Sequence, residues 1–144
     1  MRRTVLTLFA AAAALAACSA PNSDSDAVRV EGAIVTLPAV AGRPGAAYFT
    51  ATAPKADVRL QRVASANAGR TELHEAGMQP VAEVALPTGE AVAFAPGGRH
   101  VMLFELDPAL RPGGHIPLTF TFAGASPVTV QAEVRAPGDV HGGH

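Results

Sequence analysis

The chain has 144 residues, of which 49% are hydrophobic and 16% are charged, so it is long and apolar enough for one globular domain. Its formal charge is −1 at pH 7, and loss of an N-terminal segment containing Arg2 and Arg3 would make it −3. This balance disfavours a nucleic-acid binder, which needs a clustered basic surface, and the 5% aromatic content without Trp disfavours base stacking.

The first 17 residues have the three parts of a bacterial secretory signal. Arg2 and Arg3 precede an apolar run over residues 5–15, and small residues follow at the expected cleavage point. The apolar run is shorter than the ~20 residues that comfortably span a membrane. We therefore predict that residues 1–17 are a signal peptide and not an element of the fold.

The sequence Leu15-Ala16-Ala17-Cys18 resembles the bacterial lipobox, whose cysteine is lipidated and becomes the first mature residue. Cys18 is the only cysteine, so no intrachain disulfide is expected. Several acyl chains anchor a protein stably, because each buried CH₂ contributes ~0.8 kcal/mol. We predict that Cys18 anchors the protein on the periplasmic side of a membrane through a tether, residues 18–26. Ser19, in place of the Asp associated with inner-membrane retention, favours the outer membrane; the alternative is an ordinary signal with a chance cysteine.

Residues 27–136 consist of short runs rich in Val, Leu, Phe and Thr, which Pro and Gly separate at roughly even intervals. This pattern predicts an all-β sandwich or barrel. The expected strands are residues 28–36, 46–52, 58–64, 71–74, 81–86, 91–95, 100–106, 116–122 and 128–135. The alternation of apolar and polar residues in the last two strands predicts which side chains face the core. They are Leu118, Phe120, Phe122, Val130 and Val134.

No enzyme motif is present in the sequence. It lacks G-x-S-x-G, H-E-x-x-H and a glycine-rich phosphate loop placed between a strand and a helix. His74-Glu75 begins like the zinc-binding motif, but Met78 stands where that motif needs its second histidine. We therefore expect a binding protein and not an enzyme.

The two methionines beyond the signal peptide, Met78 and Met102, each lie close in sequence to a histidine. His100 and Met102 share one face of a predicted strand, about 6 to 7 Å apart. His74 and Met78 flank a segment with Gly77 that suits a tight hairpin, which would bring them face to face. Two imidazoles and two thioethers form a soft, neutral site that favours Cu(I) over Zn(II), Ca(II) or Mg(II). The alternative is that the methionines are core residues and the histidines are solvated.

The spacing and the flanking sequences resemble those of the PCu(A)C family of periplasmic copper chaperones. The motif of that family contains His, Met, a gap of 21 residues and His-x-Met, and 21 residues separate Met78 from His100. The resemblance covers about residues 28–135. The strings that carry it are Thr71-Glu72-Leu73-His74-Glu75, Pro96-Gly97-Gly98-Arg99-His100-Val101-Met102-Leu103, Pro117-Leu118-Thr119-Phe120-Thr121-Phe122 and Gly45-Ala46-Ala47-Tyr48-Phe49.

The resemblance implies a cupredoxin-like Greek-key β-sandwich that binds copper near its surface, with His74, Met78, His100 and Met102 as ligands. It also implies delivery of copper to a cytochrome oxidase subunit, its assembly factors or other periplasmic acceptors. Only three residues separate His74 from Met78, where the family usually has about ten, so the short hairpin could turn His74 away from the site.

Two other interpretations follow from the same sequence. A cupredoxin electron carrier is disfavoured, because a blue-copper site needs a thiolate and the only cysteine is Cys18. A structural or adhesion lipoprotein with a metal-free β-sandwich is the main alternative to the copper chaperone. Residues 137–144 are expected to be a flexible tail, whose His141 and His144 could capture Cu(II) loosely.

Overall fold

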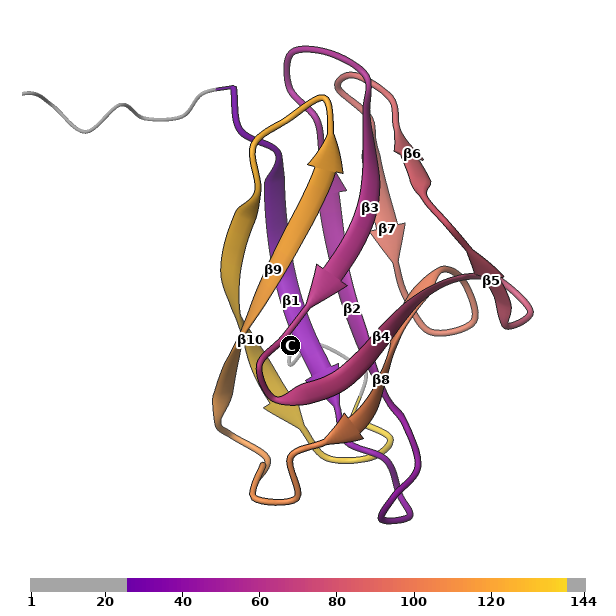
Figure 1. The fold of residues 1–144 in the computed structure, drawn as a ribbon, viewed down its shortest axis with the longest axis vertical. Coiled ribbons are helices and arrows are strands. Elements are labelled where there is room, and N and C mark those ends of the chain that lie inside the picture. Colours follow the sequence, from indigo (N-terminus) through magenta and orange to yellow (C-terminus); the bar gives the residue numbers. More distant parts are fainter. Residues whose placement is uncertain (1–25, 140–144) are drawn as a thin grey trace, which may run out of the picture.

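The computed structural model describes residues 26–139 (Figure 1). The expected signal peptide, Cys18 and the tail histidines His141 and His144 lie outside these residues. Within them we find no helix of the length and apolarity that a membrane crossing requires. The ten strands are β1 (Arg29–Thr36), β2 (Gly45–Thr52), β3 (Val58–Ala64), β4 (Ala68–Glu75), β5 (Gln79–Val81), β6 (Val84–Leu86), β7 (Ala91–Phe94), β8 (His100–Leu106), β9 (His115–Ala123) and β10 (Val128–Arg135).

The strands form one continuous hydrogen-bonded sheet that curves back on itself (Figure 1). Its order is β5-β4-β8-β2-β1-β10-β9-β3-β6, and β7 pairs with β2. Neighbouring strands are antiparallel except for β1 and β10, which are parallel. The expected all-β sandwich is confirmed, and its layers are joined by hydrogen bonds into a barrel-like arrangement.

The core lies between the strands that the curved sheet brings face to face. Phe120 of β9 is fully buried and meets Phe49 of β2 edge-on, with 4.8 Å between the ring centroids. Phe49 in turn stacks on Phe94 of β7 at 4.3 Å. Four of the five expected core residues are buried, namely Leu118, Phe120, Phe122 and Val134. Val130 is only half-buried and packs at the margin of the core.

One expected strand is wrong and another is longer than expected. The strand expected at 81–86 is interrupted: Val81 is the last residue of β5, which pairs with β4, whereas residues 84–86 form β6, which pairs with β3. The chain therefore leaves one partner and reaches another within a few residues. The strand expected at 71–74 spans Ala68–Glu75. Alternation along a sequence shows which face is apolar, but it does not show which strand is the partner.

Candidate metal centre

The two candidate histidines lie on neighbouring antiparallel strands, β4 and β8 (Figure 1). Their register places His74 directly opposite His100. Because side chains alternate along a strand, Leu73 and Val101 enter the core while the histidines occupy the outer face of the sheet. Even so, His74 is only 6% exposed and His100 only 8%. Their ring centroids are 5.2 Å apart and the ring planes make an angle of 45°.

In the described part of the chain, each histidine uses one ring nitrogen in a hydrogen bond and leaves the other without a partner. His74 Nε2 donates to Glu72 Oε2 at 3.0 Å, and His100 Nδ1 donates to the carbonyl oxygen of Gly98 at 2.9 Å. Among the residues that the structure describes, the buried atoms His74 Nδ1 and His100 Nε2 have no hydrogen-bond partner. A carboxylate and a carbonyl only accept, so the proton of each neutral ring lies on the bonded nitrogen. Each ring therefore offers one lone pair, the form in which imidazole binds a metal.

The distance between the rings fits a shared ion. Two imidazoles bound to one tetrahedral ion through metal–nitrogen bonds of about 2.0–2.1 Å, the value for zinc, have ring centroids about 5 Å apart. The observed separation of 5.2 Å between His74 and His100 agrees with this arrangement. The separation of the two rings is thus that of two imidazoles bound to one metal ion.

Met102 lies on the same outer face as His100, two residues further along β8. It is half-buried and stands opposite Glu72 in the β4–β8 register. The strand therefore presents a thioether beside the histidine pair, as the period of two predicts.

Met78 is placed differently from the other three candidate ligands. Glu75 pairs with Gln79, so Met78 lies in the three-residue turn of the β4–β5 hairpin. Gly77 and Met78 both have positive φ, 79° and 65°, a conformation that is uncommon for a side chain such as methionine. Met78 is 55% exposed. The short hairpin leaves His74 beside His100 and puts Met78 at the exposed tip.

A salt bridge joins the residues that adjoin the two histidines. Arg99 Nε donates to both carboxylate oxygens of Glu75, at 3.0 and 2.9 Å. The turn before β8 is closed by two backbone hydrogen bonds, from Gly98 N to Ala95 O and from Ala95 N to Arg99 O, both 2.9 Å. These contacts fix the β4–β8 register at the candidate site and orient the carbonyl that holds His100.

Glu72 is the acidic group closest to the histidine pair in the hydrogen-bond network. The hydrogen bond from His74 lowers the pKa of the Glu72 carboxyl, and the nearby Arg70 guanidinium lowers it further. Within residues 26–139, no three His, Cys, Asp or Glu side chains converge in a geometry that holds a metal ion.

Sequence reasoning identified the histidines and methionines but missed Glu72, Glu75 and Arg99. A signal for Glu72 was present, since it lies two residues before His74 and a strand period of two puts both on one face. The contact between Glu75 and Arg99 had no such signal, because it depends on the register of two strands that are distant in sequence.

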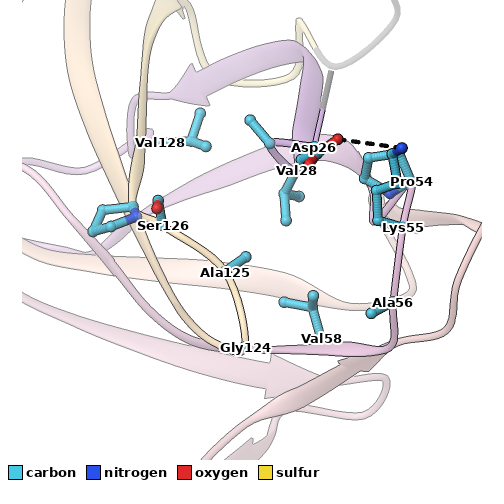
Figure 2. A pocket seen from close by; sticks show the side chains of 12 residues that line it. Asp26, Val28, Pro54, Lys55, Ala56, Val58, Gly124, Ala125, Ser126 and Val128 are labelled. Carbon is cyan, nitrogen blue, oxygen red and sulfur yellow. Dashed lines mark ion pairs between the residues drawn. The ribbon is translucent and has the colours of Figure 1, made fainter. Parts of the chain in front are cut away.

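A pocket of about 520 Å³ lies at another end of the fold, where the described chain begins (Figure 2). Val28, Val58 and Val128 line it with apolar groups. An ion pair of 3.4 Å between Lys55 Nζ and Asp26 Oδ1 lies at its edge (Figure 2). None of the candidate metal ligands lines this pocket, so it is separate from the histidine pair.

The solved structures that are similar to this fold include domains named PCuAC. The copper-bound PCuAC domain from PmoF2 has a TM-score of 0.69 and 27% identity, over 76% of this chain and 93% of that domain. The apo PCuAC domain from PmoF1 has a TM-score of 0.70 and 26% identity, over 76% and 94%. The solution structure of Cu(I)-bound DR1885 from Deinococcus radiodurans has a TM-score of 0.64 and 27% identity, over 72% and 75%. These matches confirm the resemblance to PCu(A)C domains.

Comparison with curated protein sequences gave no match. The sequence profile of the LpqE-like lipoprotein family matches residues 28–134, a range that contains nine of the strands in full and all but the last residue of β10. This chain therefore belongs to the LpqE-like lipoprotein family.

Proposed function

We propose that the protein is a lipid-anchored periplasmic copper chaperone that binds one Cu(I) ion. The observation that carries this proposal is the pair of buried, unpartnered nitrogens, His74 Nδ1 and His100 Nε2, on rings 5.2 Å apart. Leaving a buried polar atom without a partner costs about 1–3 kcal/mol. A bound ion would satisfy both atoms at once.

The sulfur ligands determine which ion suits the site. Met102 supplies a thioether on the face that carries His100, and Met78 supplies a second one from the hairpin tip. Thioethers are soft and uncharged, and together with imidazole they favour Cu(I) over zinc or the hard divalent ions. In this proposal His74, His100 and Met102 form the inner part of the site and Met78 closes it.

The proposed site is suited to giving copper away as well as binding it. The histidines lie on the outer face of the sheet, and the exposed Met78 offers a sulfur that a partner can reach. We propose that the recipient is a copper-acceptor protein, such as a cytochrome oxidase subunit or one of its assembly factors. Solved PCuAC domains with and without bound copper support the copper-binding part of this proposal.

Titration with Cu(I) against a competing chelator tests the binding function. A soluble form that starts at Pro21 is expected to take up one equivalent of Cu(I), and Zn(II) is expected to compete poorly. His100→Ala is expected to lose most of the affinity, whereas His115→Ala, an exposed histidine at the start of β9, serves as the matched control. Failure of the wild-type protein to bind Cu(I) would favour the metal-free structural or adhesion lipoprotein.

Lipid anchoring is tested separately at Cys18. Membership of a lipoprotein family supports export and membrane attachment. Cys18→Ala is expected to yield uncleaved or soluble protein, as judged by fractionation and intact mass. Unmodified Cys18 in the membrane fraction would contradict the anchor, and recovery in the inner membrane would contradict the outer-membrane placement.

A further inference from the structure

A row of contacts runs along the outer face of β4 and β8 and ends at one of the histidines. The register pairs Arg70 with Phe104, Glu72 with Met102, and His74 with His100. The Arg70 guanidinium lies 3.9 Å from the centroid of the Phe104 ring, and Arg70 Nη1 forms an ion pair with Glu72 Oε1. The other carboxylate oxygen, Oε2, accepts the hydrogen bond from His74 Nε2. The contacts thus run from the aromatic ring to the cation, from the cation to the carboxylate, and from the carboxylate to His74.

The two oxygens of Glu72 have different partners, and this division restricts the carboxylate. The ion pair with Arg70 is charge-assisted and holds one oxygen. Arg70 is itself held over Phe104 by a cation–π contact. With one oxygen restrained in this way, the second remains directed at His74, which is almost fully buried.

We infer that Glu72 is a positioning residue of the proposed copper site, which keeps the proton of His74 on Nε2 and the lone pair on Nδ1. The inference rests on the proposed function. A carboxylate only accepts hydrogen bonds, so the contact exists only while Nε2 carries the proton. If the ring rotated by half a turn, it would lose this bond, and Cδ2 would take the place of Nδ1 at the proposed ion. Carboxylates that bind the second nitrogen of a metal-bound histidine orient the ring in this manner.

Two acceptors hold the histidine rings, the Glu72 carboxylate and the Gly98 carbonyl. Only the Glu72 carboxylate can be removed by a substitution. The backbone carbonyl of Gly98 does for His100 what Glu72 does for His74, and no side-chain change deletes it. Altering Glu72 therefore releases one ring while the other stays held. This asymmetry allows the role of the support to be measured within a single site.

The test combines NMR of the histidine ring nitrogens with Cu(I) competition titration, on the full chain in detergent micelles. In the wild-type apo protein, His74 is expected to be protonated at Nε2 and unprotonated at Nδ1. Glu72→Leu removes the acceptor, and Glu72→Asp keeps the charge but shortens its reach. Both variants are expected to show mixed tautomers at His74 and to bind Cu(I) about 10- to 100-fold more weakly.

Two further variants separate positioning from general effects of charge. Glu72→Gln keeps an acceptor oxygen at full reach and is expected to bind Cu(I) more tightly than Glu72→Asp. Glu133→Leu is the matched control, because Glu133 pairs with Arg135 two residues away on β10, as Glu72 does with Arg70 on β4. This control is expected to leave both the His74 tautomer and the Cu(I) affinity unchanged.

The outcomes distinguish the two proposals. An unchanged His74 tautomer and unchanged Cu(I) affinity in Glu72→Asp would overturn the positioning role while leaving the copper site intact. If Glu72→Leu does not fold, Glu72→Asp alone decides the matter. If the wild-type protein binds no Cu(I), the proposed function fails, and the ring-nitrogen signals still decide whether Glu72 determines the tautomer.

Discussion

Within residues 26–139, His74 and His100 each use one ring nitrogen in a hydrogen bond and leave the other unpartnered. Buried polar atoms are nearly always paired in native proteins, so two unpartnered nitrogens on adjacent rings are unusual for a purely structural pair. The burial of both rings also limits their rotation. The residues of the proposed site are therefore arranged without an ion, which would reduce the ordering cost of binding one.

The methionines provide a prediction at this scale. Met102→Leu keeps volume and apolarity, so the free energy of unfolding is expected to change by less than about 1.5 kcal/mol. Its Cu(I) affinity is expected to fall clearly, because one sulfur ligand is lost. Met78→Leu is expected to have a smaller effect, since Met78 lies at an exposed turn. Competition titration and chemical denaturation measure the two quantities; full Cu(I) affinity in both variants would place copper elsewhere.

The positions of some candidate ligands were predictable from the sequence, and those of others were not. The period of two in a strand puts His100 and Met102 on one face, and the structure has them there. That His74 stays beside His100 despite the short hairpin was not predictable, because it depends on the register of β4 against β8. The expectation that Met78 faces His74 across the hairpin is wrong. His74 pairs with Pro80, and Met78 lies in the turn.

At the scale of elements, the β4–β8 pairing determines the site. The strands come from distant parts of the chain, and the salt bridge between Glu75 and Arg99 joins them next to the two histidines. Both side chains are more than a third exposed, so the bridge contributes little to overall stability. Its effect is expected on the geometry of the site instead.

Arg99→Ala tests this role of the salt bridge. The free energy of unfolding is expected to fall by less than about 1 kcal/mol, as for other surface ion pairs. Loss of a residue that hydrogen-bonds directly to a metal ligand typically weakens metal binding by about 10- to 100-fold. The Cu(I) affinity of Arg99→Ala is expected to fall by less than this. Arg59→Ala is the matched control, because it breaks the Arg59–Glu83 pair between segments equally far apart in sequence. Equal Cu(I) affinity in the two variants would contradict the role.

A second link between elements predicts a dependence of stability on pH. The backbone N–H and the hydroxyl of Thr88 both donate to Asp57 Oδ1, and these bonds lower the pKa of the Asp57 carboxyl. A lowered pKa in the folded state means that the contribution is complete above the unfolded value of about 3.9 and is lost as pH falls through the folded value.

Asp57→Asn is therefore expected to flatten the loss of stability on acidification. Denaturation curves recorded at several pH values below about 4, around the unfolded pKa, compare the variant with the wild-type protein. The difference between the two proteins is expected to shrink as pH falls, because protonation removes the same charge from Asp57. Parallel pH profiles would show that the bonds from Thr88 do not stabilise the ionised carboxylate.

For the whole molecule, the alternation of apolar residues was enough to predict an all-β fold with most of its core. The continuous sheet order was not predictable, since pairings such as β1 with β10 join distant segments and leave no local pattern. The fold carries the candidate metal centre on its outer face while the opposite faces of the same strands build the core. Stability and the proposed copper binding are thus separated across the thickness of one sheet.

Phe120→Ala tests this separation. The side chain is fully buried against Phe49, so its loss is expected to lower the free energy of unfolding by about 3–5 kcal/mol. Under conditions where the variant remains folded, its Cu(I) affinity is expected to equal that of the wild-type protein. A loss below about 1 kcal/mol, far from the cost of emptying a packed core position, would show that the ring is not well packed. A large change in affinity would show that core and site are coupled.

X-ray absorption at the copper edge of the Cu(I)-loaded protein tests the central claim most directly, because it identifies the atoms bound to the ion. We predict two imidazole nitrogens, from His74 and His100, together with sulfur. The sulfur signal is expected to decrease in Met102→Leu and to vanish when Met78 is replaced as well. A copper ion bound only by nitrogen and oxygen, or sulfur scattering that survives both replacements, would contradict the proposed site.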